Sequence, residues 1–495
     1  MSGIRWALFF ASLERYISLV VSFATIAIVS RLLTPTEVGT SAIGTALITI
    51  AISLKEFAGS GFLIQGKEVG RRDVRTAFTV QFALTLVIAA AVVFVAPRFA
   101  AFYREPMLTL FVRVMATALL LDTFASPITS LLRRDLAFGT LAIISVATLC
   151  VSALVTVGLA ASGFSFMSVA WAWLAATLTT MTLSVAYRPD LWIFRPSLEA
   201  WRRALAFGGY NGAMTVLQRL YEGLPQLVLG LLLPLGMVGL YNRATVISGI
   251  TDKLFLAGVF NVAFPVLAAE TRAGHNLKQC LLKAFSYITA FYWPSLLLMG
   301  LLAHPLVRLV LGAQWDAVVP LVQIIAVAIL VWFPVMLTQP LLLAIGAMRH
   351  ALLSSLIALP LSALVLCAAS SFGVEAMAAS QLVTTPFQMY VALRFIRRHA
   401  PFTWMELAVA LRPSAVVSIC SILPVLLVIG LTGFDLRLSL PLAIVAGGLS
   451  GCGWVVGIRL TGHPVGAEIH RAAEILGRHT AAARLVARLL AVGAG

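Results

Sequence analysis

Residues 13–75 read LERYISLVVSFATIAIVSRLLTPTEVGTSAIGTALITIAISLKEFAGSGFLIQGKEVGRRDVR, two long apolar segments followed by a basic loop. Each segment carries charge where a membrane helix normally has none. The first contains Glu14, Arg15 and Arg31, and the second contains Lys55 and Glu56. A charge that faces lipid costs several kcal/mol, so such residues normally turn toward a protein interior or a watery cavity.

The spacing of polar residues supports a cavity. A helix places residues three, four and seven apart on one face. The first segment has a polar stripe with this spacing: Arg15, Ser18, Ser22, Thr25. The second segment has another: Ser41, Thr45, Thr49, Ser53, Glu56. Two adjacent striped helices predict the wall of a hydrophilic cavity inside a membrane protein, although the alternative for each Ser or Thr is ordinary helix–helix packing.

Composition identifies a polytopic membrane protein. Hydrophobic residues make up 61% of the 495-residue chain, charged residues make up 11%, and the mean hydropathy is +1.00. The net charge of +16 does not predict nucleic-acid binding, because the basic residues lie in short loops that membrane orientation requires to be basic. The five cysteines are far apart, which predicts neither disulfides nor a metal site, and no cofactor is expected.

Fourteen apolar spans of about 20 residues fit the thickness of a bilayer. We place them at residues 13–33, 38–58, 76–96, 109–131, 140–161, 164–186, 205–233, 237–261, 281–302, 318–345, 350–371, 374–394, 411–431 and 438–459. The long seventh and tenth spans are expected to tilt or break. Loops after even-numbered spans hold eighteen Lys and Arg residues, against five after odd-numbered spans. This bias predicts that both termini are cytoplasmic.

A weak internal repeat divides the chain. The first span begins with LERY at residues 13–16 and ends with LLTPTEVG at residues 32–39. About 200 residues later, LQRLY at residues 217–221 is followed by LLPLGMVG at residues 232–239. Transporters commonly contain such repeats, with the binding site at the repeat interface.

The seventh and eighth spans carry polar stripes of their own. The seventh contains Asn211, Thr215, Arg219, Glu222 and Gln226, with Gln218 beside them, and the eighth contains Asn242, Thr245, Ser248 and Asp252. Arg243 lies about 100° from the stripe of the eighth span. Neighbouring charges could simply neutralise each other (Glu14 with Arg15, Arg219 with Glu222, Asp252 with Lys253), and charges near span ends could extend toward the membrane surface.

No enzyme motif is found. Residues 61–67 have a Walker A skeleton, but Glu68 occupies the position that requires Ser or Thr, and the motif follows an apolar helix instead of a strand. His304 and His350 are isolated, and no catalytic residue is expected. The largest hydrophilic piece is the basic tail at residues 461–495, for which two interpretations stay open: a helix on the anionic inner leaflet, or a simple solvated helix.

Two segments resemble a known family. SRLLTPTEVG at residues 30–39 with KEFAGSGFLIQ at residues 55–65, and PLGMVGLYNRA at residues 234–244, are similar to the polysaccharide transporter family. This family includes the Wzx-type flippases and belongs to the multidrug/oligosaccharidyl-lipid/polysaccharide (MOP) exporter superfamily. The resemblance implies an all-α membrane protein with two pseudo-symmetric six-helix lobes around a central cavity, plus two C-terminal helices.

The corresponding domains are an N-lobe at residues 1–190, a cytoplasmic linker at 191–204, a C-lobe at 205–400, two further helices at 401–460 and the tail. The resemblance also implies transport of polyprenyl-diphosphate-linked oligosaccharides across the bacterial inner membrane by alternating access, for O-antigen, capsule or exopolysaccharide synthesis. Membrane lipids and the polysaccharide polymerase or export machinery are the other expected partners. Related lipid II flippases use cationic residues near the cavity, which match Arg31 and Lys55 here by motif position, and Arg15 and Arg243 by helix only.

The expected substrate-binding residues are therefore Arg15, Arg31, Lys55, Arg219, Arg243, Ser22, Asn211 and Gln218. The expected ion-coupling residues are Glu14, Glu56, Asp122, Glu222 and Asp252. Two alternatives stay open: a lipid II or multidrug exporter of the same superfamily, and a membrane glycosyltransferase or polysaccharide polymerase. The second normally requires a sizeable outward loop, and none is predicted.

Overall fold

The computed structural model describes residues 2–55, 70–199, 201–252, 277–468 and 470, with the backbone alone for residues 2–13 and 201–211. Within these ranges all regular structure is helical, as expected. The chain divides into two compact units, and each is described by itself. The first comprises Met1–Asn242 and Val310–Gln314, and the second comprises Arg243–Leu309 and Trp315–Gly495. The lobe boundaries at residues 190 and 205 stay predictions.

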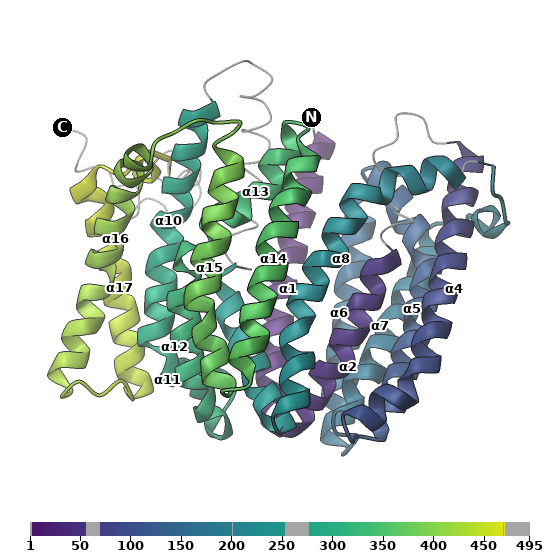
Figure 1. Cartoon of the computed structure of the whole chain (residues 1–495), viewed down its shortest axis with the longest axis horizontal. Coiled ribbons are helices and arrows are strands. Elements are labelled where there is room, and N and C mark those ends of the chain that lie inside the picture. The colour runs from purple at the N-terminus through teal and green to yellow at the C-terminus, as the bar shows by residue number, and fades with distance from the viewer. Residues whose placement is uncertain (1, 56–69, 200, 253–276, 469, 471–495) are drawn as a thin grey trace. The chain divides into compact units, whose positions relative to one another are not determined.

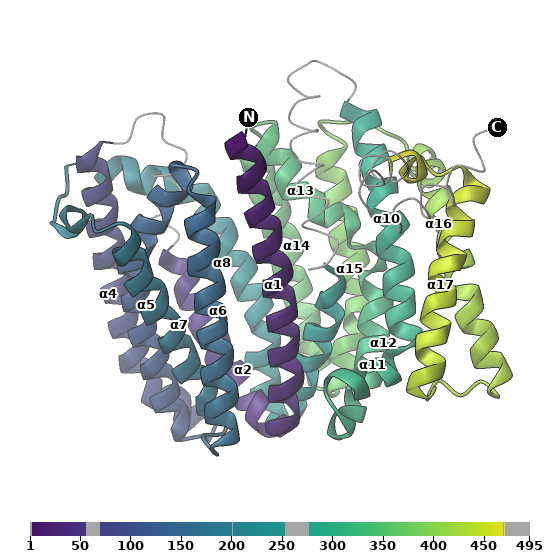
Figure 2. The ribbon, with the colours of Figure 1, turned by 180° about the vertical axis from the view of Figure 1, so that it is seen from behind.

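The first unit contains α1 (Ser2–Leu32), α2 (Pro35–Leu54), α4 (Arg71–Phe102), α5 (Met107–Arg134), α6 (Phe138–Ala161), α7 (Met167–Tyr187), the 3₁₀ helix η2 (Leu191–Phe194) and α8 (Trp201–Leu232). Thr34 and Glu37 begin α2 with a capping box, in which the Glu37 carboxylate accepts a hydrogen bond from the Thr34 backbone N–H. Helix α4 packs along α5, and α2 packs along α8 (Figure 1). Helix α1 lies beside α6 (Figure 2).

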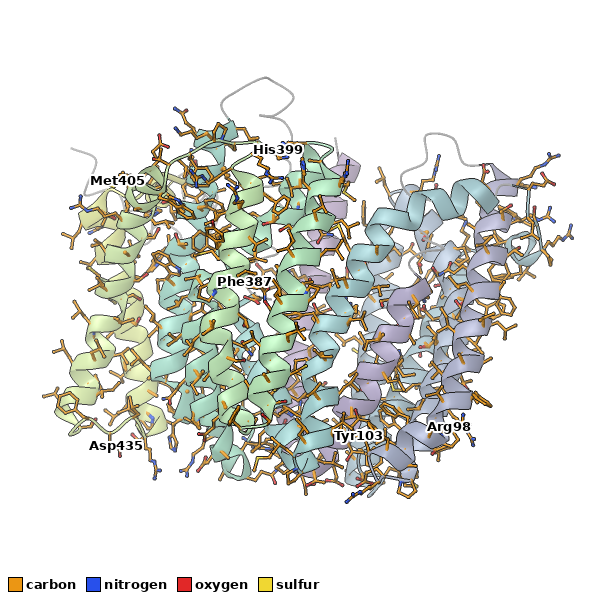
Figure 3. The ribbon with its side chains drawn as sticks, in the orientation of Figure 1. Arg98, Tyr103, Phe387, His399, Met405 and Asp435 are labelled. Carbon is orange, nitrogen blue, oxygen red and sulfur yellow. The ribbon has the colours of Figure 1, made fainter. Side chains whose placement is uncertain are left out.

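A helix starts at residue 235 and is described to residue 252, and the second unit begins within it, at Arg243. It continues through α10 (Leu277–Leu301), α11 (Ala303–Val310), η3 (Ala313–Val318), α12 (Val319–Ala328), η4 (Ile329–Val331), α13 (Phe333–Ala344), α14 (Met348–Ser370), α15 (Val374–Ile396), α16 (Trp404–Leu431) and α17 (Leu440–Thr461). Figure 3 shows Met405 at one end of α16 and Asp435 in the turn at its other end.

Eleven of the described helices are long and apolar enough to cross a membrane. Helices α8 and α15 and the helix at residues 235–252 coincide with the other three predicted spans but are not among these eleven, so the count of fourteen stays a prediction. The expected break in the tenth span is found, because η4 interrupts the helix before Pro334, at the beginning of α13. Large apolar side chains such as Phe94 and Leu427 are exposed, as lipid-facing residues should be.

The basic loops of the first unit meet at one end. Arg75 donates hydrogen bonds to the carbonyls of Arg195 (3.1 Å) and Pro196 (3.0 Å), so the segment after α7 is tied to the beginning of α4. Ile193 in η2 is fully buried in a cluster that includes Phe78. The opposite end carries Arg98 and Tyr103 (Figure 3), where the Tyr103 hydroxyl donates to the Leu227 carbonyl at 2.9 Å.

A reciprocal glycine contact supports the internal repeat. A Cβ atom added at Gly39 would lie 1.9 Å from the Leu235 carbonyl oxygen, and one added at Gly239 would lie 1.9 Å from the Pro35 carbonyl oxygen. Gly39 and Gly239 are 200 residues apart, as are Pro35 and Leu235. A local two-fold axis that relates two similar halves would produce this exchange of contacts.

Two histidines correct a sequence-based interpretation. His350, which looked isolated, lies near the beginning of α14, and its Nδ1 is 3.0 Å from Nε2 of His399. Burial lowers the pKa of the His399 imidazole, and the neighbouring His350 and Arg398 lower it further. This pair joins α14 to the segment that follows α15.

Candidate functional site

A cavity of about 600 Å³ lies within the first unit, with lining residues from α1, α5, α6 and α7. Helix α1 contributes Glu14, Ser18 and Ser22, which are spaced four residues apart and therefore share a face. Two of the predicted site residues, Glu14 and Ser22, thus line the same cavity. Arg15 is half-buried and is not among the lining residues.

The α6 and α7 walls of this cavity were not predicted from the sequence. Ser145, Thr148 and Ser152 from α6 face it, together with Thr129 from α5 and Thr180 from α7. The spacing of the three α6 residues was a signal that could have found them. The charge-based search missed it because the predicted span at residues 140–161 contains no ionisable side chain except Cys150. The remaining lining residues are Arg133, Phe138, Leu141, Ile144, Leu149 and Ala176.

Two predicted site residues on α2 and α5 form an ion pair. The Lys55 ammonium donates a hydrogen bond to Oδ2 of Asp122. The Lys55 side chain is only 8% exposed, whereas the Asp122 side chain is 44% exposed. Lys55 also caps the C-terminal end of α2, where a positive charge interacts favourably with the helix dipole. Asp122 therefore compensates a charge that would be costly to bury alone.

A second group of predicted residues gathers on α8. Arg219 donates to Oε2 of Glu222 at 2.7 Å, and the Gln218 amide donates to Oε1 of the same carboxylate at 2.9 Å. The side chains of Arg219 and Glu222 are both about half exposed. Arg219 and Glu222 thus neutralise each other, which is one of the two interpretations that the sequence leaves open for this pair.

Arg31 lies in the last turn of α1 and is exposed. The neighbouring backbone is held by Gln314, whose amide donates to the carbonyls of Ser30 (2.6 Å) and Leu33 (3.2 Å). Gln314 belongs to the short segment Val310–Gln314 that packs with the first unit. This end of α1 is therefore fixed by a distant part of the chain.

Arg243 is, besides Lys55, the other predicted cation that is buried. Only 9% of the residue is exposed, and its guanidinium carbon lies 5.7 Å from the ring centroid of fully buried Trp315. Its Nε atom is buried and has no hydrogen-bond partner among the described residues. None of the ion pairs in the described part of the chain includes Arg243.

Asp252 lies on the same helix, at the last residue described before residue 277. Its Oδ1 accepts a hydrogen bond of 2.8 Å from the Tyr292 hydroxyl of α10. Glu56 lies outside the described residues, and Asn211 lies in the part of α8 described by its backbone alone. The described residues contain no group of three or more His, Cys, Asp or Glu side chains that could hold a metal ion.

The end of the first unit that carries the basic loops contains a charge network outside the spans. Arg188 donates to Asp190 at 2.7 Å and to Asp135 at 2.6 Å. The hydrogen bond from Arg188 holds the pKa of the Asp190 carboxyl below its ordinary value. The network joins the end of α7 to the end of α5, next to the Arg133 that lines the cavity.

Comparison with known proteins gives consistent results. Residues 28–320 match the model of a family described as "Polysaccharide biosynthesis protein". The lipopolysaccharide biosynthesis protein WzxC of Escherichia coli (strain K12) is 22% identical over 332 residues, which are 66% of each chain. The succinoglycan biosynthesis transport protein ExoT of Rhizobium meliloti (strain 1021) is 23% identical over 62% of each chain. The matches thus span slightly less than two thirds of these relatives.

The fold is similar to that of the lipid II flippase MurJ in its inward closed conformation. The TM-score is 0.74, and the alignment covers 92% of this chain and 98% of that chain at 10% identity. At this identity the likeness concerns the fold alone. The family match and the relatives confirm the resemblance to polysaccharide transporters that residues 30–39, 55–65 and 234–244 indicated, and the likeness to MurJ in fold agrees with it.

Proposed function

Because this chain belongs to the family of polysaccharide biosynthesis proteins, we propose that it moves polyprenyl-diphosphate-linked oligosaccharides across the bacterial inner membrane. Its relatives are named as polysaccharide biosynthesis and transport proteins, and the helices are those of a multi-pass membrane protein. In this proposal the cytoplasmic loops are the basic ones, and the cavity opens to each side of the membrane in turn.

The observation that carries the proposal is Arg243. A buried charge without a partner costs several kcal/mol, so proteins normally pair it or use it to bind a ligand. Among the described residues, the Trp315 ring is the only group found to compensate the guanidinium, and a cation–π contact supplies about 2 kcal/mol when desolvated. A diphosphate would supply the missing acceptors, because guanidinium groups bind phosphate oxygens with paired hydrogen bonds.

The buried positive charge of Arg243 disfavours one of the alternatives, a multidrug exporter whose substrates are cations. Transport requires no covalent chemistry, and the side chains only have to exchange hydrogen bonds with the substrate. Among the acids proposed to couple an ion, Asp122 and Glu222 already hold basic partners. Asp252 accepts its hydrogen bond from a neutral tyrosine. Asp252 is therefore better suited than Asp122 or Glu222 to take up a cation or proton during the transport cycle.

Replacement of Arg243 tests the function. In a deletion strain, wild-type protein should restore surface polysaccharide and clear undecaprenyl-diphosphate-linked repeat units from the cytoplasmic leaflet. Arg243→Ala should fail in both respects, and Arg243→Lys should restore part of the activity if a point charge suffices. Arg98→Ala is the matched control, because Arg98 also lies over an aromatic ring (4.9 Å from Phe94) but is exposed. Full activity of Arg243→Ala would refute the role of this residue.

A further inference from the structure

The cavity of the first unit contains an unusual concentration of hydroxyl groups. Helices α1, α5, α6 and α7 together direct seven Ser and Thr side chains to its wall: Ser18, Ser22, Thr129, Ser145, Thr148, Ser152 and Thr180. Its volume of about 600 Å³ lies within the range of about 300–1,000 Å³ that is usual for small-molecule sites. The cavity is therefore large enough for a ligand and not only for one or two waters.

Many hydroxyls on the described helices donate to a carbonyl of their own helix. Thr25 of α1 donates to the Val21 carbonyl at 2.7 Å, and Thr156 of α6 donates to the Ser152 carbonyl at 2.7 Å. Serine and threonine commonly form such bonds to the carbonyl three or four residues earlier. A hydroxyl satisfied in this way has less capacity to bind a ligand.

Four of the hydroxyls in the cavity differ. Within the described parts of the chain, no side-chain hydrogen bond is found for Ser18, Ser22, Ser145 or Ser152. They come from two helices that pack against each other, α1 and α6 (Figure 2). Each hydroxyl can donate one hydrogen bond and accept others, so the cavity holds four unused donors that a guest could employ.

The rest of the wall limits the class of guest. Glu14 supplies acceptors and Arg133 supplies donors, whereas Phe138, Leu141 and Leu149 are apolar. A polyprenyl tail would leave the hydroxyls and charges unpaired, and a cationic drug would meet Arg133. A pyranose ring combines hydroxyls at its edge with an apolar face of C–H groups, so it complements both parts of this wall. The position of Arg133 suits an anionic group beside the ring.

We propose that this cavity is a subsite for the glycan portion of the substrate, with the first pyranose rings hydrogen-bonded to Ser18, Ser22, Ser145 and Ser152. The inference rests on the proposed function, because it supposes a lipid-linked oligosaccharide as the transported molecule. Arg243 belongs to the second unit and carries the diphosphate proposal independently. Sugar recognition and phosphate recognition can therefore be separated by mutation.

The experiment measures the affinity of the purified full-length protein, in detergent, for three probes. One is undecaprenyl diphosphate, and the other two are the same lipid with a single glucose or a single galactose attached. Wild-type protein should bind at least one of the glycosylated lipids more tightly than the bare lipid. The triple variant Ser22→Ala/Ser145→Ala/Ser152→Ala should lose about tenfold or more in affinity for that lipid, the effect expected for loss of two or three hydrogen bonds. Its affinity for undecaprenyl diphosphate should be unchanged.

The matched control is Thr156→Ala/Thr182→Ala. These residues lie on α6 and α7, outside the cavity, and bond to their own backbone, as shown by the 2.8 Å distance from Thr182 to the Leu178 carbonyl. The control should bind all three lipids as wild type does. A triple variant that keeps its preference for the glycosylated lipid would overturn the subsite, and so would wild-type protein that binds all the lipids equally. Wild-type protein that binds no lipid would refute the proposed function itself and the subsite with it.

Discussion

The contact between Gly39 and Gly239 makes a quantitative test of the internal repeat possible. A methyl group at either position would lie 1.9 Å from a backbone carbonyl oxygen of the opposite helix, whereas ordinary contacts begin near 3.4 Å. The helices must therefore separate by about 1.5 Å, the difference between these two distances. Neither carbonyl can rotate away as a side chain would, so the change is costly. Insertion of one methyl group into a close-packed site typically costs about 1–3 kcal/mol, and occasionally more.

Alanine would also stabilise the helix itself by about 1 kcal/mol relative to glycine. The net effect of Gly39→Ala should still be destabilising, because a clash with backbone belongs to the upper part of the overpacking range. Gly447→Ala is the matched control. Gly447 lies within α17, and a Cβ atom there would meet nothing within 4 Å, so this change should be neutral or stabilising.

The assay is thermal unfolding of detergent-purified variants, followed by intrinsic fluorescence. Gly39→Ala and Gly239→Ala should lower the midpoint by similar amounts, and Gly447→Ala should not lower it. The double variant Gly39→Ala/Gly239→Ala should cost less than the sum of the two single changes, because one displacement of the helices accommodates both methyl groups. Additive losses would refute the shared crossing, and midpoints that do not change would refute the close approach itself.

Three further changes have directions that the structure determines. Lys55→Met should lower the free energy of unfolding by less than about 3–5 kcal/mol, the usual cost of breaking a fully buried ion pair, because the Asp122 side chain is 44% exposed. The double variant Lys55→Met/Asp122→Leu should recover stability, as measured by denaturant titration. Tyr103→Phe should lower the free energy of unfolding by about 1 kcal/mol, because the hydrogen bond to the Leu227 carbonyl is lost. Burial raises the pKa of Tyr103 to about 12, so the absorbance of the wild type should show no ionisation of Tyr103 below about pH 11. Burial lowers the pKa of His463, so the neutral imidazole is favoured in the folded state. The stability contributed by neutral His463 should therefore be complete above about pH 6.5 and be lost as the pH falls toward the folded-state pKa. The thermal midpoint of His463→Gln should depend less on acid than that of the wild type.

The fold class could be predicted because lipid constrains the sequence strongly. A helix that crosses a bilayer must be long and apolar, and the PTE that follows Thr34 marks the beginning of α2. The residues at which the helices begin and end were harder to predict. The third span was predicted at residues 76–96, but α4 runs from Arg71 to Phe102 because a helix can continue beyond the hydrocarbon layer. The break in the tenth span was predicted, and η4 lies just before Pro334, a residue type that interrupts helices.

The site could be predicted in part. The spacing of Ser18 and Ser22 identified the face of α1 that lines the cavity, but the sequence could not show that α6 supplies the opposite hydroxyls, because the order in which helices pack is a tertiary property. The pairing of Lys55 with Asp122, 67 residues away, depends on the relative register of α2 and α5. A search for charges finds both residues without indicating that each neutralises the other.

The distinction between satisfied and unsatisfied polar groups then carries more functional information than polarity alone. Lys55, Arg219 and Arg243 were all expected to bind substrate, yet each of the first two has a carboxylate partner within its own unit. Helix hydroxyls divide in the same way, since Thr156 bonds to its own helix and Ser152 does not. Removing polar groups from water is costly unless they form hydrogen bonds, so the groups left without partners are those for which a ligand contributes most free energy. By this criterion the substrate contacts should be sought at Arg243 and at the serines of α1 and α6, before the more numerous charges that already compensate one another.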